Sequence, residues 1–418
     1  MTLGHPADYR EIYDTKSKYE KTIFFRQFRL YGEDNLFTTQ RYSDHQIKKR
    51  KFASAYSKSN VTANAEGLVR ERVEAFIEEI SATPNGLVDF FVLMDCFSHD
   101  VMTRFLYGPS HATDAIRNPN DRPYIVNLKR SQIYTPLGVN LGWLHGSWLL
   151  KSLLGITYTK TCEARDDMMR HMESKLREHD DDPDRDLDYS LYRVLRQARV
   201  EGDHMSKNYM VSEMFDHLSA GQMTTASTLT YVVWRLSRQP EWQVRLQEEL
   251  RAMPVNDKGR VHLSTIEACP VLDAVINETL RLHPVASGRQ ERIVPAGGRT
   301  YSGVFVPEGT TVIGPTLVLH HDPEVYPDPQ SWLPERWLEA DEAHLKAMEY
   351  SFVPFGHGAR KCIGLHLASM EMRLLLTSIY RRFSTKLSET STDESMEMLS
   401  ALAAVPRGLR CELYVAKG

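Results

Sequence analysis

The feature that most constrains this chain is a glycine-rich loop around Cys362, from Phe352 to Gly364, with the sequence F-V-P-F-G-H-G-A-R-K-C-I-G. Its glycines permit a tight turn and a close approach of the backbone to a flat ligand, which a Cβ atom would obstruct. They are Gly356, Gly358 and Gly364. Directly after the loop, apolar residues recur at helical spacing, at Leu367, Met370, Leu374 and Leu375. The spacing therefore predicts a helix, with Cys362 on the loop that opens into it.

The predicted surroundings favour a thiolate over a thiol at Cys362. The positive end of the following helix and the neighbouring cations Arg360 and Lys361 all stabilise the charged form of the sulfur. A thiolate in such a loop can act as a nucleophile, as a redox switch or as an axial ligand to iron. The cysteine by itself leaves these roles open, and a lone loop cysteine is most often structural.

Nearby side chains favour the iron ligand. A nucleophile needs a partner base, and the nearest histidines, His357 and His366, have no carboxylate at a position that would orient them. An axial ligand needs aromatic and glycine surface against a macrocycle, and cations for its propionates. Phe355, Gly358 and Arg360 supply these features.

Length and composition limit the number of domains and the kinds of partner and cofactor that the chain can have. The 418 residues contain no Gly/Ser-rich or Pro-rich linker, so one domain spanning residues 1–418 is the simplest organisation. A formal net charge of −4 gives no global reason to expect nucleic acid as a partner. The five cysteines are scattered and lack C-x-x-C spacing, which argues against a disulfide framework or a zinc site. The first residues resemble neither a signal peptide nor a membrane span, so we expect this chain alone to be soluble.

Periodicity predicts a mainly helical fold with small, late β-sheets, which is an α+β class. Helical patterns cover residues 6–13, 67–107, 159–179, 206–236, 242–251 and 271–282. Residues 285–318 are rich in Val, Thr, Gly and Pro and contain a predicted short hairpin after Tyr301. Two further strand-like runs lie in residues 401–416, around Pro406.

A charged constellation precedes the cysteine loop. Glu278 and Arg281 are three residues apart and therefore lie on one helix face. Arg336, within P-E-R-W, is placed to complete a partly buried network with them. Glu278-x-x-Arg281, then P-E-R-W, then F-x-x-G-x-R-x-C-x-G, in this order and spacing, resemble the cytochrome P-450 superfamily. In its general sequence character the chain is most similar to the microsomal-type fungal members that modify secondary metabolites.

The resemblance implies haem b as cofactor, with Cys362 as the proximal thiolate ligand of the iron. It implies that Phe355 packs against the thiolate and the haem, and that Arg360 and Arg292 pair with propionates. His45 and Lys49 occupy positions where the family usually has a Trp-x-x-x-Arg pair. Whether Lys49 or the adjacent Arg50 makes the contact remains open. Electrons would come from NADPH through a partner reductase.

The long helix departs from the family at one position. Residues 220–225, A-G-Q-M-T-T, match the signature in which small residues leave room for O₂ and Thr224, followed by Thr225, helps deliver protons. The usual carboxylate is replaced by Met223, whose thioether cannot relay protons. Proton delivery must then use Thr224 and water, or another acid such as Asp216. Two kinds of reaction are therefore open. One is hydroxylation in which water takes the place of the missing acid, and the other is altered chemistry such as ring formation, epoxidation or desaturation.

The resemblance also implies a lipophilic substrate, such as a fungal terpenoid, polyketide or alkaloid. The expected pocket residues are Ala220, Gly221, Met223, Val285, Ala286, Ala401 and Leu402. The aromatic run Phe24–Phe28 and the glycine-broken segment 136–155 are candidates for a lid. Apolar residues of that segment, including Trp143, Trp148 and Leu149, either touch a membrane surface or fold onto the protein's own core.

Family members of the membrane type have about 80–100 residues before the point that corresponds to Met1. We therefore expect either a truncated sequence or a short form, and endoplasmic-reticulum attachment on the cytosolic face for a form with the usual anchor. The expected enzyme is a monomeric monooxygenase. Rival functions are a non-oxygenating haem-thiolate isomerase or dehydratase, a degenerate haem-binding protein, and a cysteine hydrolase that uses Cys362.

Overall fold

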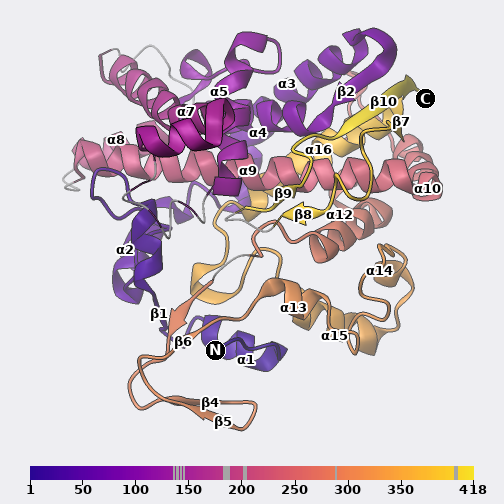
Figure 1. The fold of residues 1–418 in the computed structure, drawn as a ribbon. Helices are drawn as coiled ribbons and strands as arrows, with labels where there is room; N and C mark the ends of the chain where they lie inside the picture. Colours follow the sequence, from indigo (N-terminus) through magenta and orange to yellow (C-terminus); the bar gives the residue numbers. More distant parts are fainter. Residues whose placement is uncertain are drawn as a thin grey trace.

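Helices dominate the architecture, and small antiparallel sheets lie around them (Figure 1). The computed structural model describes residues 1–134, 137, 141, 144, 146–181, 189–200, 205–287, 290–399 and 403–418. The α-helices are α1 (Pro6–Tyr13), α2 (Tyr42–Ala53), α3 (Lys58–Ala82), α4 (Phe90–Tyr107), α5 (Arg122–Arg130), α7 (Trp148–Asp181), α8 (Leu191–Val200), α9 (Lys207–Arg238), α10 (Pro240–Ala252), α11 (Leu263–Glu267), α12 (Pro270–Leu282), α13 (Thr316–His320), α14 (Arg336–Glu339), α15 (Glu342–Ser351) and α16 (Leu365–Arg382).

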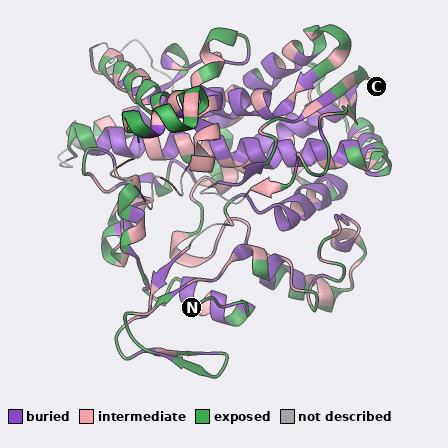
Figure 2. Ribbon diagram, viewed as in Figure 1, coloured by how far each residue is buried: buried purple, intermediate pink, exposed green. Residues whose placement is uncertain are grey.

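The helix α9 runs through the middle of the molecule and is coloured as buried along most of its length (Figure 2). It begins where the Ser206 side chain accepts a hydrogen bond from the Tyr209 amide, a capping contact that satisfies one free helix donor. Its closest neighbour is α4, and α12 and α16 also pack on it. The α+β fold predicted from the sequence is confirmed, with α9 as its central element.

The sheets are small, and every pairing between their named strands is antiparallel. One sheet has the order β1 (Glu20–Lys21), β3 (Arg292–Ile293) and β6 (Thr311–Val312). A second has the order β2 (Leu87–Asp89), β10 (Glu412–Lys417) and β7 (Phe383–Leu387). The predicted hairpin forms between β4 (Arg299–Tyr301) and β5 (Val304–Val306), with Arg299 opposite Val306. A fourth sheet pairs β8 (Met398–Leu399) with β9 (Val405–Pro406).

Two predicted segments are organised differently in the structure. The helical pattern predicted for residues 67–107 is broken, because Asn85 and Gly86 adopt positive φ angles of 59° and 66° and the strand β2 follows. The helix before the break also starts earlier, at Lys58. The two strand-like runs in residues 401–416 do not pair with each other: β9 pairs with β8, whereas β10 pairs with β2 and β7. The strand β9 thus pairs with its near neighbour in the sequence, whereas β2 and β10, at opposite ends of the chain, pair with each other.

Two hydrophobic cores hold these elements. The larger contains side chains of α3, α4, α9, α12 and α16, and the smaller joins α1 to the β3–β6 region through residues such as Tyr9, Tyr301 and Val312. The cysteine loop lies between α15 and α16 and contacts α1. The loop therefore connects the smaller core to the helical body.

Candidate active site

The backbone of the cysteine loop is fixed by close packing. The Cys362 amide donates to the Phe355 carbonyl at 2.9 Å, which closes the loop on itself. Gly356 and Gly358 have positive φ angles of 72° and 65°, a conformation that favours glycine. A Cβ atom on Gly358 would lie 1.9 Å from the backbone oxygen of Tyr13, at the end of α1. The glycine at 358 is therefore required by the neighbouring helix as well as by the turn.

Burial and nearby charges act in opposite directions on Cys362. Its side chain is accessible to solvent, yet the surrounding protein raises the pKa of its thiol by burial. Backbone amides of Gly364 and Leu365 and the cations Lys49 and Lys361 act in the opposite direction, but burial outweighs them. The sequence-based expectation of a thiolate stabilised by its neighbours is thus wrong in net direction for the protein alone, because desolvation dominates. A bound metal cation would supply the missing positive charge.

Arg360 and Lys49 both donate hydrogen bonds to backbone carbonyls. The two terminal nitrogens of Arg360 donate to the carbonyls of Thr39 and Gln40, at 2.8 and 2.7 Å. Lys49 Nζ instead donates to the carbonyls of Ala359 and Lys361, at 2.7 and 3.2 Å. Arg50 is exposed. Of the two candidates on α2, Lys49 is therefore the one that contacts the cysteine loop.

A group of buried cations lies beside this loop. Burial, and then the charge of Arg292, lowers the pKa of Arg360 to about 9. Burial, and then Arg360 and Lys21, lowers the pKa of His45 to about 2, so this imidazole is neutral near pH 7. Arg292 is buried and donates only to the carbonyls of Gln290 and Glu291, with its guanidinium over the Tyr13 ring.

Arg292 and Arg360 form no ion pair among the residues that the structure describes, although the charge of Glu20 raises the pKa of Arg360. The buried Nε of Arg360 has no hydrogen-bond partner in the described part of the chain. Uncompensated buried cations are costly, so the cluster is suited to a dianionic ligand. The residues present therefore fit a haem whose propionates reach this cluster and whose iron reaches Cys362.

A narrow accessible stripe runs along α9. Ala220 is exposed and Asp216 and Thr224 are half-buried, whereas Leu218 and Ala226 are fully buried. Residues four apart lie on one face of a helix, so Asp216, Ala220 and Thr224 form one line. Figure 2 shows the helix buried elsewhere along most of its length. The stripe and Cys362 are thus accessible surfaces within the helical body.

The remaining residues of the signature have different surroundings. Thr224 Oγ1 donates to the Ala220 carbonyl at 2.8 Å, and Thr225 is buried. Met223 is 7% exposed. A Cβ atom on Gly221 would lie 2.4 Å from the sulfur of Met102, so this glycine allows α4 to approach α9. That packing reason is separate from the room for O₂ that the family signature implies.

The distance along α9 makes Asp216 a poor proton donor to Thr224. The two residues are eight positions apart, which corresponds to about 12 Å of helix rise. Burial raises the pKa of Asp216 to about 7, although Lys21 and the Phe37 amide act in the opposite direction. The Asp216 carboxyl can therefore exchange a proton near neutral pH, but only a chain of several waters would connect it to the Thr224 hydroxyl.

Glu278, Arg281 and Arg336 meet in one buried network. The Glu278 carboxylate accepts two hydrogen bonds from Arg281, at 2.8 and 2.7 Å, and one from Arg336 at 3.1 Å. It also accepts the Leu333 amide and the Trp337 indole N–H. Arg281 further donates to three backbone carbonyls in the 320–331 segment. The network thereby ties α12 to the chain that leads to the cysteine loop.

The expected substrate-contact segments come together in part. The Ala404 amide donates to the Val285 carbonyl at 2.8 Å, which joins the two segments that the sequence suggested. Val285 is buried and Ala286 is exposed. Ala401 and Leu402 lie outside the described residues, as does Gly288.

One polar cluster was missed from the sequence. Asp95 of α4 and Lys129 of α5 are both fully buried, with their charged atoms 3.6 Å apart. Gln222 of α9 donates to Asp95 and lies 2.8 Å from His99 Nδ1. The sequence does contain a sign of this cluster: Asp95 and His99 are four residues apart in the apolar run 90–106. Polar residues in a buried helix almost always have hydrogen-bond partners, so this pair predicts polar partners on neighbouring helices. The cluster connects α4, α5 and α9.

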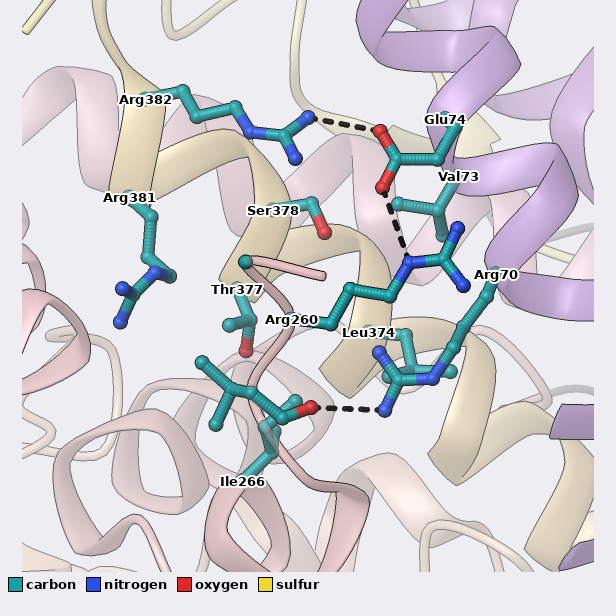
Figure 3. A pocket seen from close by; sticks show the side chains of 12 residues that line it. Arg70, Val73, Glu74, Arg260, Ile266, Leu374, Thr377, Ser378, Arg381 and Arg382 are labelled. Atoms are coloured by element: carbon teal, nitrogen blue, oxygen red, sulfur yellow. Dashed lines mark hydrogen bonds and ion pairs between the residues drawn. The ribbon is translucent and has the colours of Figure 1, made fainter. Parts of the chain in front are cut away.

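A further small pocket lies away from this site, between α3 and α16 (Figure 3). Several arginines line it, but they already have partners: Glu74 pairs with Arg260 and Arg382, and Arg70 donates to the Val261 carbonyl. None of its lining residues belongs to the cysteine loop.

An accessible cysteine on a loop that opens into a helix, with buried cations near the loop, is the arrangement expected of a haem-thiolate protein. The comparisons agree: the family model for Cytochrome P450 matches residues 1–412. This chain belongs to the cytochrome P450 family. Membership implies haem iron as the cofactor and electrons supplied from NAD(P)H by a reductase.

Fungal relatives cover nearly the whole chain. It is 32% identical to the cytochrome P450 monooxygenase FGM1 of Gibberella zeae, over 99% of this chain and 83% of that protein. It is 26% identical to the cytochrome P450 monooxygenase aflV of Aspergillus parasiticus, over 99% and 82% respectively. A mammalian relative, cytochrome P450 3A9 of Rattus norvegicus, is 30% identical over 72% of this chain and 59% of its own length.

No helix in the described ranges combines the length and the apolar character needed to cross a bilayer.

Proposed function

We propose that this chain is a haem-thiolate monooxygenase whose single domain, residues 1–418, oxidises a lipophilic small molecule with O₂ and reductase-supplied electrons. The observation that carries the proposal is the placement of Cys362: accessible, yet desolvated, and near buried arginines that form no ion pair in the described part of the chain. The haem, once bound, supplies the oxygen activation and redox chemistry that side chains lack. The protein supplies the ligand, the orientation and the substrate pocket.

The proposed haem contacts use residues on and near the cysteine loop. Cys362 is the iron ligand, and Phe355, packed on the main core beside it, supports the loop. Arg292 and Arg360 bind the propionates, and neutral His45 donates a ring N–H to them. Lys49 holds the loop through the Ala359 and Lys361 carbonyls instead of reaching a propionate.

Thr224 is the proposed proton-delivering residue. Its hydroxyl is accessible on the α9 stripe, and in this structure its proton is engaged by the Ala220 carbonyl. Met223 has no titratable proton, so the proposed source of protons for Thr224 is water. Thr225 is buried and supports the helix locally. Hydroxylation with water as substitute is the reaction that we propose.

A second candidate is an isomerase or dehydratase that needs neither O₂ nor reductase. The buried thioether of Met223, where the family has an acid, favours it. Turnover under argon without NADPH would support this candidate, and strict dependence on both reagents would eliminate it.

The proposed substrate is a fungal secondary metabolite, such as a terpenoid, polyketide or alkaloid. The pocket would lie over Ala220, Thr224 and the joined segments at Val285 and Ala404, with Ala286, Ala401 and Leu402 beside them. The first matched relatives are fungal proteins, which supports this substrate class without identifying a compound.

We also propose peripheral membrane contact through the start of α7. Five large apolar side chains are exposed there within nine residues, with Trp148 80% and Leu153 75% exposed, so this part does not fold onto the core. The others are Leu149, Leu154 and Ile156. An endoplasmic-reticulum location on the cytosolic face and a monomeric state are part of the same proposal.

The first test is the carbon monoxide difference spectrum of the reduced, haem-loaded protein. A strongly red-shifted Soret band is expected, because thiolate ligation changes the electronic structure of the haem. Cys362→Ser should lose this band while other cysteine variants, such as Cys162→Ser, keep it. Retention of the band in Cys362→Ser would overturn the assignment of the ligand.

A further inference from the structure

The pocket between α3 and α16 has more positive than negative side chains in its wall (Figure 3). Among its lining residues, the only carboxylate belongs to Glu74. The wall is built by α3, by the segment 259–266 and by the last turns of α16, so three separate parts of the chain bring their charges together there. The lining arginines are Arg70, Arg260, Arg381 and Arg382.

Two of these arginines share one counter-ion. Glu74 lies 4.0 Å from Arg260 Nε through one carboxylate oxygen and 3.1 Å from Arg382 through the other, and Figure 3 shows both guanidinium groups directed at it. Arg70 has a carboxylate of its own, because its Nε lies 2.8 Å from Glu66. A single negative charge therefore serves two arginines in the wall of this pocket.

The fourth arginine adds charge without a counter-ion. Arg381 donates to the carbonyls of Leu250 and Met253, and it forms no ion pair among the residues that the structure describes. Burial, and then the charges of Arg382 and Arg251, lowers the pKa of Arg381. The four lining arginines and the two carboxylates Glu74 and Glu66 thus leave a formal surplus of two positive charges.

A buried hydroxyl in the wall also lacks a partner. Thr377 is 3% exposed, and its Oγ1 has no hydrogen-bond partner in the described part of the chain. Threonines inside a helix commonly donate to the carbonyl four residues earlier, as Thr228 and Thr230 do in α9. Buried polar atoms without any partner are rare in folded proteins. An acceptor oxygen in the pocket would give the Thr377 hydroxyl the partner that its own helix does not.

The size of the pocket limits what such an acceptor can be. Its volume of about 50 Å³ admits a few water molecules or one small oxyanion, and excludes an organic cofactor. Guanidinium groups bind phosphate oxygens through paired N–H donors, and each such charge-assisted bond is stronger than a neutral one. A phosphate dianion matches the pocket in size, in charge and in its need for donors.

We propose that this pocket binds a phosphate group, with Arg260 and Arg382 as its charged donors and the Thr377 hydroxyl as a third donor. Glu74 competes with the phosphate for the same two arginines. The ligand would join α3 to α16, the helix that follows the cysteine loop, so its binding would stabilise the folded chain. The proposal is independent of the haem chemistry and adds a second ligand to this protein.

The test measures anion binding to the haem-loaded full chain by titration calorimetry, at constant ionic strength and at a pH where phosphate is mainly a dianion. Inorganic phosphate and glycerol 3-phosphate distinguish a free ion from a phosphate ester. Perchlorate, a tetrahedral monoanion, reports non-specific binding. The variants are Arg260→Gln, Thr377→Val and Glu74→Gln. Arg407→Gln is the matched control, because Arg407 forms an exposed pair with Glu397 at 2.6 Å and does not line the pocket.

The wild type and Arg407→Gln should bind phosphate at least about tenfold more tightly than perchlorate. Arg260→Gln should weaken phosphate binding by about tenfold, and Thr377→Val by about threefold. Glu74→Gln should tighten it by at least about threefold, because two arginines lose their competing partner. This opposite sign distinguishes the pocket from general attraction of anions.

Equal affinities of the wild type for phosphate and perchlorate would overturn the inference. So would an unchanged phosphate affinity in both Arg260→Gln and Glu74→Gln, since binding would then occur elsewhere. Glycerol 3-phosphate identifies the source of the phosphate group: an affinity equal to that for inorganic phosphate supports an ester as the ligand, and a much weaker one supports the free ion.

Discussion

Replacing Lys129 by methionine should destabilise the protein strongly, because it leaves a buried carboxylate alone. Asp95 and Lys129 are both 0% exposed, and the lysine also lies over the Phe91 ring at 4.2 Å. Asp95 otherwise has only the Gln222 amide at 3.3 Å, and its second oxygen has no hydrogen-bond partner in the described part of the chain. Among the other described residues, only the weaker charge of Arg130 also lowers the pKa of this carboxyl.

The magnitude follows from the pKa and from the geometry. Burial raises the pKa of Asp95 from 3.8 to about 6 even with Lys129 present. At 1.36 kcal/mol per unit, ionised Asp95 costs about 3 kcal/mol at pH 7. Burial also lowers the pKa of Lys129, so the pair gains little over neutral side chains. Removing one partner should cost about 3–5 kcal/mol, whereas Asp95→Asn with Lys129→Met should restore or exceed wild-type stability.

The pH dependence has a defined sign. A carboxyl with a raised folded pKa destabilises the fold most fully above that pKa, and the penalty disappears as pH falls toward the unfolded value. The single variant Lys129→Met should therefore recover stability between pH 7 and pH 5. The double variant, which has no ionisable pair, should show a smaller change.

The assay is urea unfolding at fixed haem loading, followed by tryptophan fluorescence at pH 7 and pH 5. The exposed pair Lys346–Glu342, with an N–O distance of 2.6 Å, is the matched control, and Lys346→Met should change stability by less than about 1 kcal/mol. A loss below about 1 kcal/mol for Lys129→Met, or a double variant as unstable as the single one, would refute the reasoning.

Three further outcomes are expected. Met223→Asp should couple product formation more tightly to NADPH use if a missing acid limits proton delivery, and unchanged product and coupling would make Met223 a bystander. Gly358→Ala should abolish haem loading, measured by absorbance, because its Cβ would lie 1.9 Å from the Tyr13 oxygen; normal loading would contradict the packing. Glu278→Gln should cost about 3–5 kcal/mol in urea unfolding, since two buried arginines lose their counter-ion. A near-neutral effect would show that their backbone carbonyl partners suffice.

The sequence determined the features that depend on local spacing. Proline placement and apolar periodicity predicted the helix at 6–13 with its observed bounds, and the long helix within two residues at each end. The glycine loop before an apolar repeat placed Cys362 at the start of a helix. The order of the charged motifs then indicated the family. These signals depend on residues that are close together in the sequence, so they can be interpreted without knowledge of the fold.

Only the tertiary structure decided which distant groups meet. It selected Lys49 over Arg50 as the contact to the cysteine loop, and it explained Gly358 through Tyr13, a residue more than three hundred positions away. It reversed the expected effect on the Cys362 thiol and showed that burial raises the pKa of Asp216. Desolvation is the physical reason, because the ionisation of a buried group depends on every element that excludes water from it, and sequence spacing does not encode that burial.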